Sequence, residues 1–327
     1  MNIRKAIARF CMLAAAGAFL VSGSLTAQAA ETYPDKPITL IVPYAPGGST
    51  DILGRLIGDR LSRHFDQNVI IENRAGADGT LGVVQTRRQK PDGYNLTMLP
   101  LTVLRQPHLI DVAYDPIEDI TWISSMTNYN YAIAVPWDSP WETIEDLITA
   151  VKENPGKYDY AGSSPYSSNN LAMVEFAREA DLDWQYIAFK GDIDGLNALM
   201  GNHVDIVSST VTSLMPFVES ERLRPLVVAG PQRSPDLPDV PTLKEKGYEV
   251  GLTSPLGLGG PANMDPEVVA IIDGAIQEAL EDPAFIEQAQ KQGWTELLYM
   301  NHEDYSKWAA ETFEKEKSII ERLSDQQ

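Results

Sequence analysis

The 327-residue sequence has a single cysteine, Cys11, which lies in an apolar N-terminal segment. Three basic residues precede an apolar run at 11–20, and a small-residue motif follows at 27–29, which is the order of a bacterial export signal. We interpret residues 1–29 as a cleaved signal peptide; an uncleaved membrane anchor is the alternative, although the run is short for a transmembrane helix. Cleavage would remove the cysteine, and with it any disulfide, thiolate nucleophile or cysteine metal ligand.

Basic residues are also scarce. The chain has 26 Lys and Arg against 46 Asp and Glu, a net charge of −20, and removal of the signal peptide leaves 23 against 46, a net charge of −23. Phosphate contacts need a basic surface, so we expect no nucleic-acid partner. An anionic ligand would have to be held by local dipoles against the overall field of the protein.

Catalytic motifs are missing as well. The four histidines occur in unrelated contexts, and the sequence has no H-E-x-x-H, no G-x-S-x-G and no G-x-x-x-x-G-K phosphate loop. Gly257–Gly260 lacks the strand and helix spacing of a dinucleotide fingerprint. We therefore expect no catalytic residue, no metal site and no cofactor, and the sequence favours a binding protein over an enzyme.

The most informative segment that is present lies near the mature N-terminus. Residues 38–44 are mainly apolar and predict a strand, Ala45–Asp51 predicts a turn, and apolar residues at helical spacing predict a helix that ends near Phe65. Gly47 and Gly48 let the backbone approach a ligand, and the free N–H groups at a helix N-terminus suit a carboxylate or phosphate. An ordinary capped helix without a ligand is the alternative.

The same strand, polar loop and helix pattern recurs in the second half of the chain. After the first occurrence of the pattern, the sequence predicts strands at 69–72 and 95–99 with a helix at 80–89 between them. The second occurrence has a strand at 158–161, a polar loop at 162–170 and a helix at 171–180. This alternation predicts parallel sheets with right-handed crossovers. A mature chain of this length is expected to form two lobes.

Seven motifs, in order along the chain, are those of a known family. They are Tyr33–Ile38, Val42–Gly48 with Asp51, Glu72–Ala77, Pro91–Tyr94, Phe189–Gly191, Leu223–Leu226 and Arg233–Thr242. Together they resemble the extracytoplasmic solute receptors of tripartite tricarboxylate transporters, the Bug-type receptors. The resemblance spans nearly all of the mature chain.

The resemblance implies an α/β periplasmic binding protein with two lobes and type II topology, each lobe being a mainly parallel sheet flanked by helices. Lobe 1 would comprise residues 31–130 and 236–327, and lobe 2 would comprise residues 131–235, with two crossover strands between them. A small organic carboxylate, either a di- or tricarboxylate or an aromatic carboxylate, would bind in the cleft. The protein, expected to be a periplasmic monomer, would deliver the ligand to the membrane subunits of a tripartite tricarboxylate-type transporter.

The resemblance also implies the ligand-binding residues, whose backbone N–H groups and hydroxyls would hold a carboxylate together with bridging water. They are Tyr44, Ala45, Pro46, Gly47, Gly48, Ser49, Thr50 and Asp51 after the first strand, Leu101 and Thr102 after Leu99, Ser163, Ser164, Tyr166, Ser167 and Ser168 in the second-lobe loop, and Phe189, Lys190 and Ser209.

The second-lobe loop departs from the family pattern, with Pro165 and Tyr166 in place of small residues and Asn170 where His is usual. Tyr166 either stacks on an aromatic ligand or fills space. Arg105 either pairs with a distal carboxylate of the ligand or is a solvated arginine at a loop end. Lys190 contacts the ligand or serves lobe packing.

Other functions and several ligands stay open at this stage. The protein could signal to a membrane sensor instead of feeding a transporter, and a periplasmic enzyme on the same scaffold is a further alternative. The ligand could be an aliphatic dicarboxylate, an aromatic carboxylate or an amino acid.

Overall fold

In the computed structural model, the residues that can be described are 33–162, 165–250, 254–294 and 296–324. The chain divides into a unit from Met1 to Asp35, of which only residues 33–35 are described, and a unit from Lys36 to Gln327. The predicted signal peptide, and the predicted ligand contacts Ser163 and Ser164, lie outside the described residues. In the part of the chain that is described, no helix is long and apolar enough to cross a membrane.

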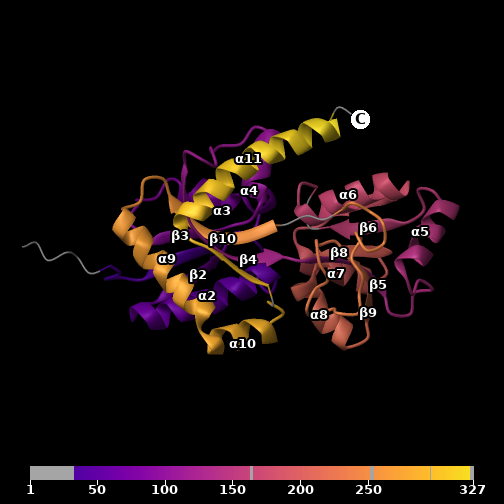
Figure 1. Ribbon diagram of the computed structural model, residues 1–327, viewed down its shortest axis with the longest axis horizontal. Helices are drawn as coiled ribbons and strands as arrows, with labels where there is room; N and C mark the ends of the chain where they lie inside the picture. The colour runs from indigo at the N-terminus through magenta and orange to yellow at the C-terminus, as the bar shows by residue number, and fades with distance from the viewer. Residues whose placement is uncertain (1–32, 163–164, 251–253, 295, 325–327) are drawn as a thin grey trace, which may run out of the picture. The chain divides into compact units, whose positions relative to one another are not determined.

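The first sheet of the larger unit has six strands from both ends of the sequence (Figure 1). They are β1 (Ile38–Val42), β2 (Val69–Asn73), β3 (Asn95–Leu99), β4 (Ile120–Tyr129), β10 (Ser254–Pro261) and β11 (Leu297–Met300), in the order β11-β4-β10-β3-β1-β2. Strand β1 pairs in parallel with β2 and β3, whereas β10 pairs antiparallel with β3 and β4, and β11 pairs antiparallel with β4.

The second sheet has five strands from the middle of the sequence. They are β5 (Tyr131–Pro136), β6 (Asp159–Gly162), β7 (Gln185–Ala188), β8 (Ile206–Thr210) and β9 (Leu223–Val228), in the order β7-β6-β8-β5-β9. Strand β6 pairs in parallel with β7 and β8, and β5 pairs antiparallel with β8 and β9. In the first sheet, the antiparallel strand β10 lies beside β3, the last strand of the parallel set β1, β2 and β3. In the second sheet, the antiparallel strand β5 lies in the same way beside β8, the last strand of the parallel set β6, β7 and β8, and this is the type II order. The α/β, two-sheet fold class is confirmed.

Both sheets also contain reversed strands: β10 and β11 run against the other four strands of the first sheet, and β5 runs against the other four strands of the second. Strands β5 and β10 are the first strands after the two passages of the chain from one sheet to the other. Strand β10 was not predicted, since its sequence SPLGLGGP is rich in Gly and Pro, which are depleted in strands. A Cβ on Gly257 would lie 2.5 Å from the Ser124 carbonyl oxygen and 2.5 Å from the Tyr305 ring, so the close packing around this inner strand requires glycine.

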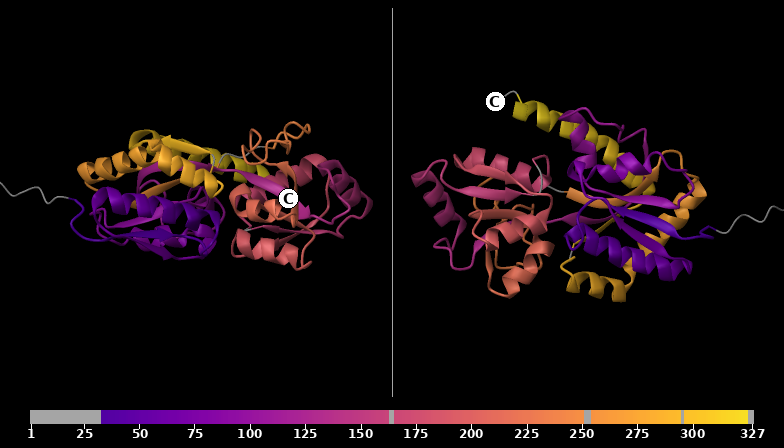
Figure 2. Two further views of the ribbon diagram at one scale, coloured as in Figure 1. Left: turned by 90° about the horizontal axis from the view of Figure 1, so that it is seen from below. Right: turned by 180° about the vertical axis from the view of Figure 1, so that it is seen from behind.

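Helices flank both sheets (Figures 1 and 2). With the first sheet lie α2 (Ser49–Phe65), α3 (Leu81–Thr86), α4 (Thr102–Arg105), α9 (Pro266–Glu281), α10 (Pro283–Lys291) and α11 (His302–Ser324), and with the second lie α5 (Ile144–Glu153), α6 (Ser168–Ala180), α7 (Asp192–Met200) and α8 (Val211–Glu219). Two short 3₁₀ turns cover Ala77–Gly79 and Gln106–His108.

Helix α2 follows the predicted periodicity, and its buried stripe includes Leu53, Ile57 and Leu61. Helix α6 begins at Ser168, three residues before the predicted start, because the Ser167 side chain caps it by accepting from the Asn170 N–H. The earlier start places Ser168 in the first turn of a helix rather than in a loop.

The chain passes between the sheets twice. Asn130 alone separates β4 from β5, and a longer segment from 229 to 253 separates β9 from β10. Each passage is a point where the chain could bend, and together they are the joints expected of a two-lobe binding protein.

Candidate ligand-binding cavity

A cavity lies at the carboxyl ends of β1, β3 and β8, where ligands of open α/β sheets commonly bind. Its lining residues are Tyr44, Ala45, Pro46, Gly48, Ser49, Thr50, Pro100, Leu101, Thr102, Tyr129, Tyr131, Ser167, Ser168, Gly191, Asp192, Ile193, Asp194, Thr210 and Ser254. They come from elements of both sheets. The cavity volume is about 110 Å³, several times the roughly 10–15 Å³ that one water needs, so the cavity has room for a small organic molecule.

The structure brings together ten of the predicted contact residues in this lining. They are Tyr44, Ala45, Pro46, Gly48, Ser49, Thr50, Leu101, Thr102, Ser167 and Ser168. The other described members of the predicted set, which lie outside the lining, are Gly47, Asp51, Tyr166, Phe189, Lys190 and Ser209. Whether any of these residues contacts a ligand stays a prediction.

Asp51 holds the shape of the first loop. Its carboxylate accepts hydrogen bonds from Gly47 N–H (2.9 Å), Arg55 Nε (2.9 Å) and Asn73 Nδ2 (2.8 Å). Burial alone would raise the pKa of Asp51, but these hydrogen bonds together lower it below its ordinary value, so the carboxylate stays ionised. Gly47 has a φ of +85°, which a residue with a side chain rarely adopts.

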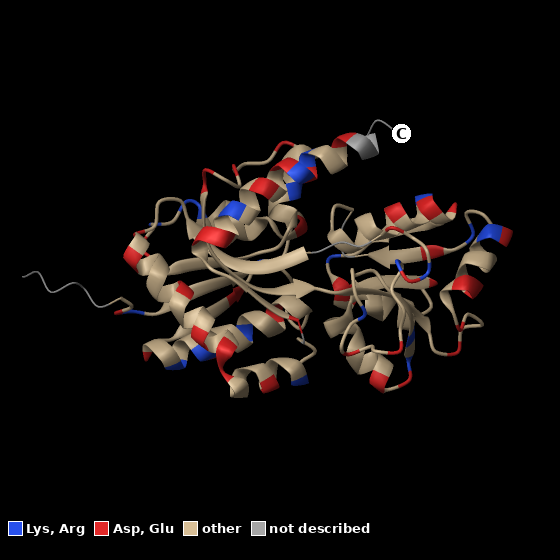
Figure 3. Cartoon of the chain, viewed as in Figure 1, with Lys and Arg blue, Asp and Glu red and all other residues tan. Residues whose placement is uncertain are grey.

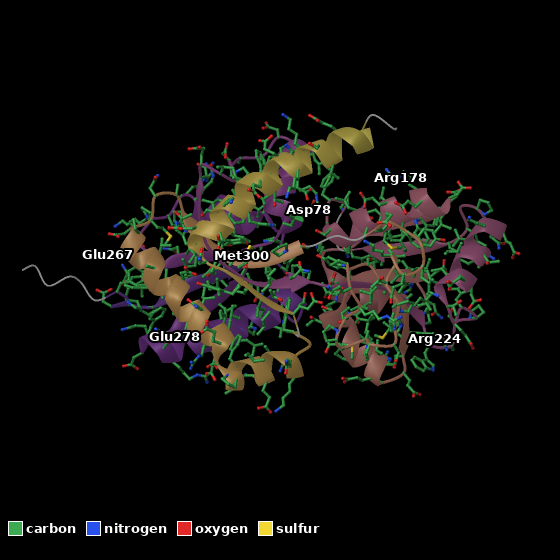
Figure 4. The ribbon with its side chains drawn as sticks, in the orientation of Figure 1. Asp78, Arg178, Arg224, Glu267, Glu278 and Met300 are labelled. Atoms are coloured by element: carbon green, nitrogen blue, oxygen red, sulfur yellow. The ribbon has the colours of Figure 1, made fainter. Side chains whose placement is uncertain are left out.

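Phe189 and Lys190 line a second, open pocket that adjoins the first and shares Tyr44 and Asp194 with it. Asp78, labelled in Figure 4, belongs to the same pocket. Lys190 therefore lies beside the first cavity rather than in its lining.

The second-lobe loop is fixed by its own side chains. Asn170 donates to the Pro165 carbonyl (2.7 Å) and accepts from the Tyr160 hydroxyl (2.8 Å). The carbonyl of Tyr166 accepts from Arg105 Nη1 at 3.0 Å. Of the three departures from the family pattern, Asn170 thus has a structural role through its side chain, whereas Pro165 and Tyr166 take part in these bonds through their backbone carbonyls.

Four helices of nine or more residues have their N-termini at the cavity. Its lining includes the N-cap residues Gly48 of α2, Ser167 of α6, Gly191 of α7 and Thr210 of α8. The two glycines have no side chain to cap the first turn, so the first N–H groups of α2 and α7 receive no side-chain cap. Helix N-termini carry partial positive charge, and their convergence suits an anion.

The lining includes no Lys, Arg or His among the described residues. Three tyrosines line it instead: Tyr44, Tyr129 and Tyr131. Burial raises the pKa of each hydroxyl above its ordinary value, so all three stay neutral hydrogen-bonding groups. Tyr129 bonds the hydroxyl of Thr50, and Tyr131 donates to Ser254 Oγ at 3.4 Å.

Comparison with known proteins identifies the family. The family model described as the tripartite tricarboxylate transporter family receptor matches residues 53–324. This chain belongs to that receptor family. A relative from Cupriavidus necator, "UPF0065 protein in gbd 5'region", is 38% identical over 324 residues, which cover 99% of this chain and 98% of the relative.

Two solved structures share the fold. The periplasmic binding protein BugD superposes with a TM-score of 0.83 at 26% identity, with 89% of this chain and 99% of BugD covered. The structure of R. palustris Rpa4515 with adipate gives a TM-score of 0.83 at 24% identity, with 90% of this chain and 97% of the other covered. Because the identity to Rpa4515 is only 24%, this similarity shows only that the two proteins share a fold.

Sequence reasoning missed about half of the receptor's cavity. Tyr129, Tyr131, Asp192, Thr210 and Ser254 were not predicted to line it. Tyr129 and Tyr131 lie on either side of Asn130, at the predicted boundary between residues 31–130 and 131–235, and this position is the signal that could have indicated them.

Arg105 connects elements of both sheets beneath the receptor's cavity. Its side chain is fully buried, with Nε 2.6 Å from Glu316 Oε2 and Nη2 3.1 Å from Glu316 Oε1. Its Nη1 donates to the Tyr166 carbonyl and to Ser168 Oγ at 3.3 Å. Ser168 in turn donates to Ser254 Oγ at 3.1 Å. The expectation of a solvated arginine is wrong, because α11 supplies a carboxylate from 211 residues away.

Proposed function

We propose that this receptor binds a small organic carboxylate in the cavity and delivers it to the membrane subunits of a tripartite tricarboxylate-type transporter. It acts in the periplasm as a monomer after removal of residues 1–29, and it catalyses no reaction. Lobe 1 comprises residues 31–130 and 236–327, lobe 2 comprises residues 131–235, and the ligand lies between them.

The observation that carries the proposal is the meeting of four helix N-termini in a cavity without a cationic side chain. The protein is strongly acidic, with acidic residues spread over many of its helices (Figure 3). A carboxylate therefore depends on N–H groups and hydroxyls at the site itself. The description of the matching family, a receptor of tripartite tricarboxylate transporters, supports a carboxylate as the ligand class.

Thermal unfolding in the presence of a carboxylate panel tests the proposal. A ligand that binds only the folded protein stabilises it by about 2.7 kcal/mol at 100 times its Kd, which shifts the unfolding temperature measurably. The panel should contain mono-, di- and tricarboxylates, aromatic carboxylates and amino acids. The proposal fails if none of them shifts unfolding at millimolar concentration.

Replacement of Ser49 with alanine should weaken carboxylate binding without abolishing it. The Ser49 hydroxyl is buried in the lining, and its loss removes one hydrogen bond to an anion, roughly 1.5–3 kcal/mol, while the N–H groups of α2 remain. Isothermal titration calorimetry of the strongest ligand in the panel measures the change. An affinity equal to that of the wild type would mean that Ser49 does not contact the ligand.

Ligand binding should also make the receptor more compact. The lining comes from elements of both sheets, and the sheets are joined by only two passages of chain, so closure by a hinge motion is expected. Small-angle scattering with saturating ligand should show a smaller radius of gyration than without ligand. An unchanged radius would contradict closure.

A further inference from the structure

Asp192, the first residue of α7, places a carboxylate in the cavity lining. Its Oδ2 accepts two hydrogen bonds from one residue, Thr210, whose backbone N–H lies at 3.1 Å and whose Oγ1 lies at 2.7 Å. Thr210 is the N-cap residue of α8. Asp192 therefore lies at the N-terminus of α7 and accepts hydrogen bonds from the N-cap residue of α8.

This arrangement divides the cavity electrostatically. Near α7 and α8, the Asp192 charge offsets the partial positive charge of the helix ends. Near α2, the N-cap residue Gly48 leaves the first N–H groups of the helix without a side-chain cap. Asp51 is the one acidic residue of the first turn, and its carboxylate already accepts hydrogen bonds from Gly47, Arg55 and Asn73. One end of the cavity thus favours an anion, and the other presents an anion.

No cation of the described chain neutralises Asp192 within the lining. The other ionisable groups there are Asp194, which is exposed, and the neutral tyrosines. Arg105, the buried cation near Tyr131, has its bonds to Glu316, Tyr166 and Ser168. Burial raises the pKa of Asp192 above its ordinary value, and a cationic group of the ligand beside it would stabilise the ionised carboxylate.

We propose that Asp192 binds a protonated amine of the ligand, so that the receptor selects carboxylates that carry an ammonium group over dicarboxylates of equal length. This inference rests on the proposed function. The ligand carboxylate lies at the N-terminus of α2, and its ammonium group donates to Asp192. A second carboxylate at that position would face the Asp192 charge instead.

Calorimetric titration with matched ligands tests this selectivity. The probes are pairs of equal chain length, an ω-amino acid and the corresponding dicarboxylate, together with α-amino acids and their deaminated analogues. Wild-type receptor should bind the amine-bearing member of its best pair more tightly. Asp192→Asn keeps the shape but removes the charge, and it should weaken that ligand by roughly 10- to 100-fold, as for loss of a charged hydrogen bond. The same variant should leave the dicarboxylate unchanged or bind it more tightly.

Two further variants secure the interpretation. Asp192→Ser retains a residue that favours a helix N-terminus and should show the same loss if the charge is what matters. Glu267→Gln removes one negative charge from the exposed start of α9, labelled in Figure 4, and should change neither affinity by more than about twofold, because exposed charges at a distance are screened by salt.

Three results would overturn the inference. If dicarboxylates bind more tightly than the amine-bearing ligands of equal length, and Asp192→Asn weakens dicarboxylate binding, then Asp192 acts as a protonated donor to a second carboxylate. If carboxylates bind but Asp192→Asn changes nothing, Asp192 is not a contact, and the proposed function survives. If no carboxylate of either kind binds, the proposed function fails with the inference.

Discussion

Replacement of Arg105 with alanine should lower the free energy of unfolding by about 3–5 kcal/mol, the cost of removing one partner of a buried ion pair. Arg105 is fully buried and Glu316 is 4% exposed, so the Glu316 carboxylate would be left without its cation in a dry site. The variant also loses the hydrogen bonds to Tyr166 and Ser168, which link α4 to the start of α6. Because Ser168 lines the cavity, ligand affinity should fall as well.

Urea unfolding followed by circular dichroism measures the stability change. Arg63→Ala is the matched control, since Arg63 pairs with Asp59 on the exposed face of α2 and such pairs contribute only about 0.3–0.5 kcal/mol. Arg105→Met combined with Glu316→Met should recover much of the loss, because an apolar pair leaves no buried charge. If Arg105→Ala were no more destabilising than Arg63→Ala, the buried pair would not be formed in solution.

Replacement of Gly48 with valine should reduce carboxylate affinity by at least about 100-fold while the protein still folds. Gly48 has φ −78° and ψ 168°, an extended conformation that valine adopts readily, and a Cβ there would meet only the Ala45 carbonyl oxygen, at 3.7 Å. The strained position is Gly47, not Gly48. Valine therefore costs little in folding, but its methyl groups block the approach of an anion to the first N–H groups of α2.

Thermal unfolding without ligand and calorimetry with the best ligand separate the two effects. Gly274→Val is the matched control, because a Cβ on this glycine of α9 meets nothing within 4 Å, and α9 does not line the cavity. That control should leave affinity unchanged and, because valine has a slightly higher helix propensity than glycine, should not lower stability. Tight binding by Gly48→Val would place the carboxylate elsewhere.

Local sequence patterns were sufficient to predict one side of the cavity. The strand, glycine turn and helix at 38–65 are encoded by neighbouring residues, and Gly48, Ser49 and Thr50 line the cavity as a consequence. The fold class could be predicted for the same reason, since alternating strands and helices leave few topologies.

The other side of the cavity could not be predicted from local patterns. Asp192 and Thr210 are 18 residues apart and meet only because β8 ends beside the start of α7. Ser254 arrives on β10, whose glycines and prolines conceal a strand that tertiary packing imposes. The Arg105 partner lies on the C-terminal helix, and an isolated arginine in a loop gives no indication of a carboxylate 211 residues away.

The proposed function requires that a carboxylate binds where the helix N-termini meet. A crystal structure of the receptor with the strongest carboxylate from the thermal panel tests it most directly. We expect ligand density in the cavity, with a carboxylate within hydrogen-bond distance of the N–H groups of Ser49 or Thr50 and with contacts to Ser167 or Ser168. Density for that ligand outside this cavity, or a carboxylate turned away from the N-terminus of α2, would contradict it.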